Sequence, residues 1–221
     1  MLEDYLIFGA PIIEQDEIEE IVRTLRSGWI GTGPRVQKFE DDFKLYKNAR
    51  NAVAVNSCTA ALHLSLLACQ LNVGDEVIVP AMTFCATVNA IIHAGATPVL
   101  ADVEPRTMNI DPKNIQDRIT KKTKAILPVH FAGRPCNMKE ITDIASQHNL
   151  LVIEDCAHAI ESEYKGKHCG TFGDFGCFSF YVTKNITTGE GGMVVCKDEE
   201  QSSYIKTMAL HGLSKDAWNR F

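Results

Sequence analysis

From residue 50 onward, short runs rich in β-branched residues alternate with longer segments that have a helical apolar pattern. This alternation is typical of a mostly parallel β-sheet with helices on its faces, and it predicts an α/β fold. We expect strands at residues 52–55, 76–79, 97–101, 124–129, 151–154, 176–181 and 192–196, and helices at 59–71, 86–94, 112–119, 138–148 and 199–210. A helix at 15–26 and a glycine-rich turn at 28–34 precede them. No repeat or linker divides the chain into two folding units.

The composition and the start of the chain argue against several classes of protein. The 28 acidic residues outnumber the 22 basic ones, which gives a net charge of −6, and no basic run is long enough to follow a phosphate backbone. We therefore expect no nucleic-acid partner. No apolar stretch approaches the length of a transmembrane helix and no signal peptide opens the chain, so we expect a cytoplasmic protein without membrane contact.

Eight cysteines lie mostly inside apolar segments, and none forms a CxxC pair. Free thiols in a reducing cytoplasm are the favoured interpretation, so we predict neither disulfides nor a metal site. Other cofactor motifs fail as well. GWIGTG and GTFGDFG lack the GxGxxG spacing, and Walker, zinc-hydrolase and GxSxG patterns do not occur.

Lys184 follows an apolar strand and precedes a turn rich in threonine and glycine, within FGCFSFYVTKNITTGEGG. A surface position is the default interpretation of any single lysine. Apolar strands on both sides, however, predict partial burial, which lowers the pKa of an amine and makes it a nucleophile toward carbonyl groups. Lys184 is therefore a candidate Schiff-base lysine.

Asp155 and His158 follow the apolar run LLVIE, at the end of a predicted parallel strand. Ligands in open α/β sheets bind at that edge. A carboxylate there can keep a pyridinium nitrogen protonated, and the histidine can contact another polar atom of the ring. The alternative is an ordinary turn capped by the aspartate, with a packed histidine beside it.

Two further strand ends carry groups that suit a phosphorylated cofactor. Residues 56–60, NSCTA, open a predicted helix, so their amides and hydroxyls form a candidate anion cradle, to which Ser179 adds a hydroxyl. Phe84 follows the strand EVIV and can lie flat against a ring. An ordinary helix cap and core packing are the respective alternatives. Because all these groups fall at strand ends on one expected edge, together they predict a site for pyridoxal 5'-phosphate (PLP).

The same segments occur in an order that resembles the DegT/StrS family of PLP-dependent nucleotide-sugar aminotransferases. The matching segments cover nearly the whole chain: SGWIGTGPRVQKFE, SCTAAL, GDEVIVPAMTFCATVNAI, GATPVLADV, KAILPVHFAGRPCNM, VIEDCAHA and FGDFGCFSFYVTKNITTGEGG. The resemblance implies a PLP-dependent transferase of fold type I, with a large domain built on a mostly parallel mixed sheet flanked by helices. It also implies a small C-terminal domain, which is absent from this chain.

The resemblance implies a role for each candidate residue. Lys184 would carry PLP as a Schiff base, Asp155 would pair with the pyridine nitrogen, and His158 would lie near the ring hydroxyl. The other cofactor-binding positions would stack on the ring or surround the phosphate: Phe84 on the ring, and Thr59, Ala60 through its amide, and Ser179 at the phosphate, with Cys58 where many members have glycine.

The resemblance further implies an enzyme that transfers an amino group from L-glutamate to a nucleotide-linked keto-sugar, in amino-sugar biosynthesis for cell-surface polysaccharide or lipopolysaccharide. The TGP loop and the pair KNIT and HGLSKDAW most resemble members that aminate C4 of a UDP-sugar, such as the UDP-4-amino-4-deoxy-L-arabinose aminotransferases. A homodimer with shared active sites is implied too. Two alternatives stay open: a PLP-dependent sugar dehydratase, in which histidine replaces the lysine, and a non-catalytic regulatory homologue.

We interpret residues 1–34 as an N-terminal helix with an active-site loop, and residues 35–221 as the PLP-binding large domain. The chain ends abruptly, with Trp218 and Phe221 close to the terminus. Full members of the family continue well beyond this point, so we expect this chain to be an N-terminal portion.

Overall fold

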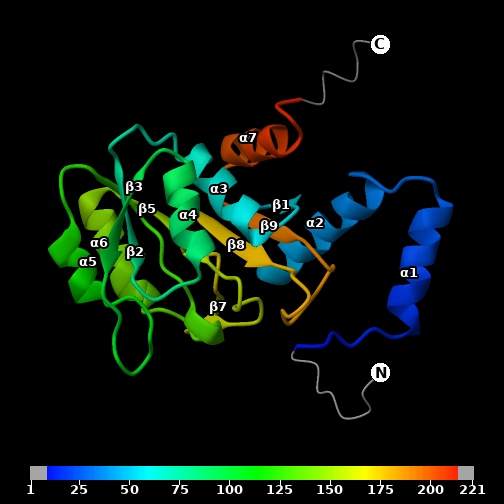
Figure 1. The fold of residues 1–221 in the computed structure, drawn as a ribbon, viewed down its shortest axis with the longest axis horizontal. Helices are drawn as coiled ribbons and strands as arrows, with labels where there is room; N and C mark the ends of the chain where they lie inside the picture. The colour runs from blue at the N-terminus through cyan, green and yellow to red at the C-terminus, as the bar shows by residue number, and fades with distance from the viewer. Residues whose placement is uncertain (1–8, 214–221) are drawn as a thin grey trace.

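The computed structural model describes residues 9–213, which build a seven-stranded sheet with helices on both faces (Figure 1). The strand order is β1-β9-β8-β5-β4-β2-β3. Its strands are β1 (Asn51–Val55), β2 (Glu76–Pro80), β3 (Thr97–Ala101), β4 (Thr123–Ile126), β5 (Leu151–Asp155), β8 (Phe175–Ser179) and β9 (Gly192–Cys196). A separate hairpin consists of β6 (Glu163–Tyr164) and β7 (Lys167–His168).

Strand direction decides which loops meet. The neighbours β8, β5, β4, β2 and β3 run parallel, whereas β9 is antiparallel to both β8 and β1. β1 therefore points the same way as the parallel strands, and β9 alone is reversed. The predicted α/β class, with a mostly parallel mixed sheet, is confirmed.

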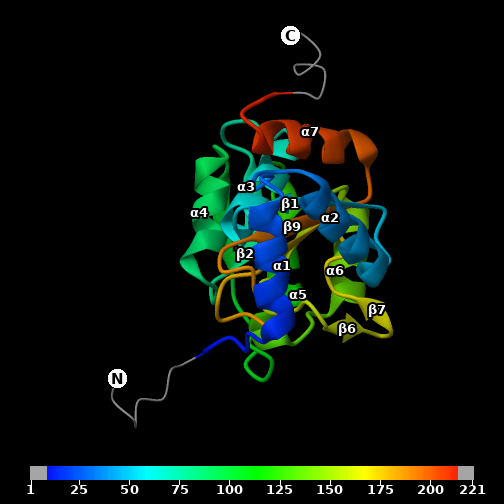
Figure 2. The ribbon, with the colours of Figure 1, turned by 90° about the vertical axis from the view of Figure 1, so that its right-hand side faces the viewer.

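The helices are α1 (Gln15–Arg26), α2 (Pro34–Lys47), α3 (Cys58–Ala68), α4 (Cys85–His93), α5 (Pro112–Arg118), α6 (Met138–His148) and α7 (Glu199–Ala209), with a short 3-10 turn at Phe131–Gly133. Figure 2 shows α3 and α4 on one side of the sheet and α6 on the other. Strand β2 is buried from both sides, because Val77 and Val79 pack toward α3 and α4 while Ile78 packs toward α5 and α6. Such double burial is why the strand is apolar without alternation.

Three elements of residues 9–213 lie outside the set predicted from the sequence: α2, the 3-10 turn at Phe131–Gly133 and the β6–β7 hairpin. α2 starts at Pro34, which suits the first turn of a helix. Its Phe43 packs against Phe178 in β8, and its Phe39 packs against Phe180 just after that strand. The hairpin turns through Lys165 and Gly166, whose φ angles are 53° and 75°. Positive φ at both central residues is the geometry of a tight hairpin turn.

The first helix is present as predicted, but none of its residues is buried. An ion pair between Glu20 and Arg35 connects it to the start of α2. The glycine-rich turn that follows α1 reaches a hollow of about 1080 Å³, where Thr32 and Gly33 lie with Ala60 among the lining residues. Residues 214–221, including the abrupt end noted in the sequence, lie outside the described residues. No helix within 9–213 is long and apolar enough to cross a membrane.

Candidate active site

The carboxyl ends of all strands except β9 lie at one edge of the sheet, and the predicted site residues start from that edge. Gly192, the first residue of β9, pairs with Val55 at the end of β1 and with Ser179 at the end of β8. Asp155 ends β5, which is parallel to β8. The ends of β1 and β8 therefore flank the start of β9, and the end of β5 lies beside that of β8, at the edge where open α/β sheets bind ligands.

Lys184 lies just beyond β8, and its side chain is half-buried, as predicted. The Nζ atom is 2.7 Å from Nε2 of His158. An ammonium group has only donors, so Nε2 accepts this hydrogen bond and the neutral imidazole carries its proton on Nδ1. Burial lowers the pKa of the Lys184 amine, opposed by the charge of Asp155. Burial and the Lys184 charge also lower the pKa of His158.

Asp155 is a buried carboxylate with protein donors on both oxygens. The Ala157 amide donates to Oδ1 at 3.1 Å, and the Thr87 hydroxyl donates to Oδ2 at 3.0 Å. Burial raises the pKa of Asp155, and these two hydrogen bonds oppose that rise by stabilising the charged form. Asp155 was predicted at this edge of the sheet, whereas Thr87 was not predicted as a site residue.

The start of α3 forms the predicted cradle, with one difference. Ser57 is the N-cap, and its hydroxyl accepts a hydrogen bond from the Ala60 amide at 3.1 Å. The amide assigned to phosphate thus already has a partner. Among residues 9–213, the amides of Cys58 and Thr59 have no acceptor, as expected in a first helical turn. These two amides, with the exposed Thr59 side chain, are the open donors of the cradle.

Close packing against β9 sets the position of this helix start. A Cβ atom on Gly192 would lie 2.5 Å from the carbonyl carbon and oxygen of Ser57 and 2.7 Å from the Cys58 nitrogen. Only glycine permits this approach, which brings Ser179 of β8, the strand partner of Gly192, near the cradle. Burial and the neighbouring Asp155 raise the pKa of the Cys58 thiol well above its usual range, so this thiol is neutral.

Phe84 precedes α4 and is 76% exposed. The alternative of core packing is therefore wrong for this side chain. It stands one helical turn before Thr87, whose amide donates to the Phe84 carbonyl and whose hydroxyl reaches Asp155. An exposed ring after a strand end at this edge of the sheet is suited to cover a planar ligand.

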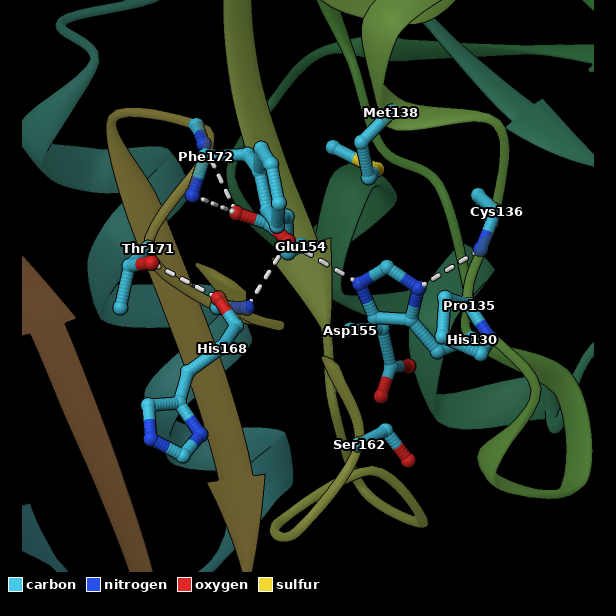
Figure 3. Close-up of polar contacts among 12 residues, drawn as sticks. His130, Pro135, Cys136, Met138, Glu154, Asp155, Ser162, His168, Thr171 and Phe172 are labelled. Atoms are coloured by element: carbon cyan, nitrogen blue, oxygen red, sulfur yellow. Dashed lines mark hydrogen bonds and ion pairs between the residues drawn. The ribbon is translucent and has the colours of Figure 1, made fainter. Parts of the chain in front are cut away.

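Glu154, the residue before Asp155, lies at the centre of a buried hydrogen-bond network (Figure 3) that was not predicted from the sequence. Its carboxylate accepts bonds from the amides of Gly170, Phe172 and Gly173 at 2.7 to 2.8 Å and from His130 Nε2 at 3.0 Å. The other ring nitrogen of His130 accepts the Cys136 amide at 3.1 Å. A charged residue inside an apolar strand was the available signal for this network.

Glu154, His130 and Cys156 also come close enough to suggest a metal site. Each Glu154 oxygen already accepts two hydrogen bonds, and both ring nitrogens of His130 are engaged. No lone pair of these two residues is left for a cation, so the cluster is structural. All eight cysteines are free thiols, and five of them are buried: Cys136, Cys156, Cys169, Cys177 and Cys196.

The fold is that of solved aminotransferase structures, one of them determined in a PLP form. The aminotransferase from Psychrobacter cryohalolentis superposes with a TM-score of 0.91 at 40% identity, over 96% of this chain and 54% of that one. The PLP form of Spr1654 from Streptococcus pneumoniae superposes with a TM-score of 0.90 at 38% identity, over 94% of this chain and 58% of that one.

The sequence comparison is more specific. A profile of the DegT/DnrJ/EryC1/StrS aminotransferase family matches residues 11–221, and the chain belongs to this family. The spore coat polysaccharide biosynthesis protein SpsC of Bacillus subtilis is 50% identical over 217 residues, which cover 98% of this chain and 56% of SpsC. The chain thus spans about half the length of the relatives that it matches. The resemblance identified from the motifs is confirmed at the level of the family.

Proposed function

We propose that this chain is the lysine-bearing, PLP-binding part of an aminotransferase that moves an amino group from L-glutamate to a nucleotide-linked keto-sugar, at C4 of a UDP-sugar. The observation that carries the proposal is the half-buried Lys184 amine, in contact with His158 and close to the buried Asp155 carboxylate. An amine with a lowered pKa beside a carboxylate suits a cofactor that has a carbonyl carbon and a basic ring nitrogen.

The chemistry of the remaining donors fits PLP. The open amides of Cys58 and Thr59 at a helix start suit a phosphate group, and the Ser179 hydroxyl lies on the strand beside them. Phe84 offers an exposed ring face. We therefore assign Lys184, Asp155 and His158 to catalysis. The proposed cofactor-binding set is Cys58, Thr59, Phe84, Asp155, His158, Ser179 and Lys184, with Ala60 in the same helical turn although its amide is bonded to Ser57.

When bound, PLP supplies an electron-withdrawing ring that takes up the electron pair left at Cα of the amino donor. Lys184 would hold the cofactor and, as a neutral amine, carry the proton taken from Cα of the donor. His158 is positioned to accept a hydrogen bond from Lys184 Nζ and so to orient the amine. Asp155, acceptor on both oxygens, would hold a proton on the ring nitrogen.

We also propose the biosynthetic process in which the protein takes part and its oligomeric state. The name of SpsC links that relative to spore coat polysaccharide biosynthesis, which supports a place for this chain in amino-sugar biosynthesis for cell-surface polysaccharide or lipopolysaccharide. We propose a cytoplasmic homodimer with shared active sites, following the family.

Lys184 weighs against the dehydratase alternative, which has histidine at that position. The complete set of acid, base and anion-binding groups weighs against a regulatory protein without catalysis.

The substrate is tested with the protein expressed from the complete gene and loaded with the aminated cofactor. It is mixed with keto-sugars linked to UDP, GDP or dTDP, with the keto group at C3 or C4, and the return of the PLP absorbance is followed. We expect the fastest return with a UDP-linked 4-keto-sugar. A preference for another nucleotide or for C3 would refute the substrate but keep the aminotransferase; no return with any keto-sugar, together with no glutamate half-reaction, would refute both.

A further inference from the structure

A chain of three polar side chains connects the start of α4 to the end of β5. Thr83 Oγ1 lies 2.7 Å from Thr87 Oγ1, which in turn lies 3.0 Å from Oδ2 of Asp155. Thr87 is buried in the interior, with 1% of its surface exposed, and it makes no other side-chain hydrogen bond within the described residues. Thr83 is half-buried and stands one helical turn earlier.

The direction of these hydrogen bonds follows from counting protons. An ionised carboxylate only accepts, so the single hydroxyl proton of Thr87 is donated to Asp155. The Thr87 oxygen is then free to accept the proton of Thr83. The Ala157 amide occupies the other carboxylate oxygen at 3.1 Å. Each oxygen of Asp155 thus accepts one hydrogen bond from the protein, and its remaining lone pair can accept one from a ligand.

The hydrogen bond from Thr87 affects whether the buried Asp155 side chain is charged or neutral. Burial raises the pKa of Asp155, which by itself favours the neutral acid. A neutral Asp155 would leave the ring nitrogen of a bound cofactor without a charged acceptor. The Thr87 hydroxyl is one of two uncharged donors that oppose this, and hydrogen bonds to a charged group are stronger than those to a neutral one.

We propose that Thr87, itself held by Thr83, is a positioning residue that fixes the Asp155 carboxylate in its ionised form so that it faces the ring nitrogen of bound PLP. This inference rests on the proposed function, because it concerns the cofactor. Removing the Thr87 hydroxyl then transfers the ring-nitrogen proton toward Asp155. The side chain acts through Asp155 and has no contact of its own with the reacting atoms.

The test uses the protein from the complete gene, saturated with PLP that carries ¹⁵N in the ring. The nitrogen chemical shift separates a protonated from an unprotonated ring, whatever the catalytic rate. In Thr87→Val, which keeps the shape and loses the hydroxyl, we expect the signal to move toward the unprotonated position and PLP binding to weaken about fivefold. Thr87→Ser keeps the hydroxyl and is the matched control, which should restore both values.

The outcomes separate this inference from the proposed function. If Thr87→Val keeps the wild-type nitrogen signal and PLP affinity, or if Thr87→Ser shifts the signal as far as valine does, the positioning role is overturned. Thr83→Val leaves the buried Thr87 unchanged and should shift the nitrogen signal in the same direction by a smaller amount. If Thr87→Val does not fold, the signal of Thr83→Val tests the positioning role in its place. A wild-type protein that binds no PLP overturns the proposed function itself, and the inference with it.

Discussion

Lys184 Nζ lies 2.7 Å from Nε2 of His158, although the two residues are 26 positions apart in the chain. The contact joins the loop after β8 to the loop after β5 across two adjacent parallel strands. It places an amine with a lowered pKa against a neutral imidazole, at the edge where the Asp155 carboxylate also ends. The amine, the imidazole and the carboxylate thus come from two neighbouring strand ends.

The lowered pKa of Lys184 predicts how PLP capture depends on pH. Only the neutral amine attacks a carbonyl, and in the folded protein this form is populated at a lower pH than in ordinary lysine, whose pKa is 10.5. The rate of PLP capture by the apoprotein should rise with pH, and the midpoint of this rise should lie below 10.5. Stopped-flow absorbance measures it. The residual reaction of Lys184→Ala with surface lysines is the control, and a wild-type midpoint that coincides with that of the variant contradicts the prediction.

Glu154→Gln is expected to destabilise the fold, since the buried carboxylate accepts four hydrogen bonds and an amide nitrogen cannot accept any. The expected loss of unfolding free energy at pH 7 is about 3 kcal/mol. Burial raises the pKa of Glu154, but hydrogen bonds from His130 and from the amides of Gly173 and Gly170 outweigh it, so the pKa is lowered in the folded state. The ionised Glu154 therefore stabilises the fold fully above pH 4.5, which is the ordinary pKa of glutamate. This stabilisation is lost as the pH falls through the lower pKa that Glu154 has in the folded protein.

Urea unfolding at several pH values measures both parts of this prediction. The exposed Glu161 is the control position, and Glu161→Gln should change stability by less than about 0.5 kcal/mol. The difference in unfolding free energy between the wild type and Glu154→Gln should become smaller below pH 4.5. A gap of the same size at every pH, or equal stability of the two glutamine variants, would show that the network does not depend on the charge.

Gly192→Ala should disturb both the sheet and the anion cradle. Its Cβ would collide with the Ser57 carbonyl and the Cys58 nitrogen, so the start of α3 must move away from β9. We expect a loss of about 3 kcal/mol in unfolding free energy and weaker binding of PLP. Gly31→Ala is the matched control, because a Cβ at Gly31 meets nothing within 4 Å and its φ is not positive. Equal effects of both substitutions in urea unfolding and PLP titration would refute the role of the close approach.

The sequence was sufficient for the parts of the site that chain order determines. Lys184 and Asp155 follow apolar strands, and the carboxyl ends of parallel strands share an edge, so their convergence could be predicted without coordinates. The exposed ring of Phe84 and the place of Thr59 in the first turn of α3 follow from the same argument. Each of these residues lies at or shortly after the end of its own strand.

The residues that sequence analysis missed act through partners far along the chain. Thr87 is an ordinary threonine in an apolar helix, and only the packing of α4 beside β5 shows that it reaches Asp155, 68 positions away. The acceptor role of Glu154 depends on amides that lie 16 to 19 residues further on. The reversed direction of β9 is likewise a matter of pairing. In contrast, α2 has a readable signal, with Pro34 at its start and an aromatic pair four residues apart.

The central claim is that Lys184 is the residue that holds the cofactor. Its most direct test is to load the protein from the complete gene with PLP, reduce it with borohydride, digest it and locate the cofactor's mass by mass spectrometry. We predict that the added mass lies on the peptide that contains Lys184, and that Lys184→Ala loses this label along with the cofactor absorbance and the glutamate half-reaction. A label on a different lysine, or a Lys184→Ala variant with unaltered absorbance and half-reaction, would contradict the claim.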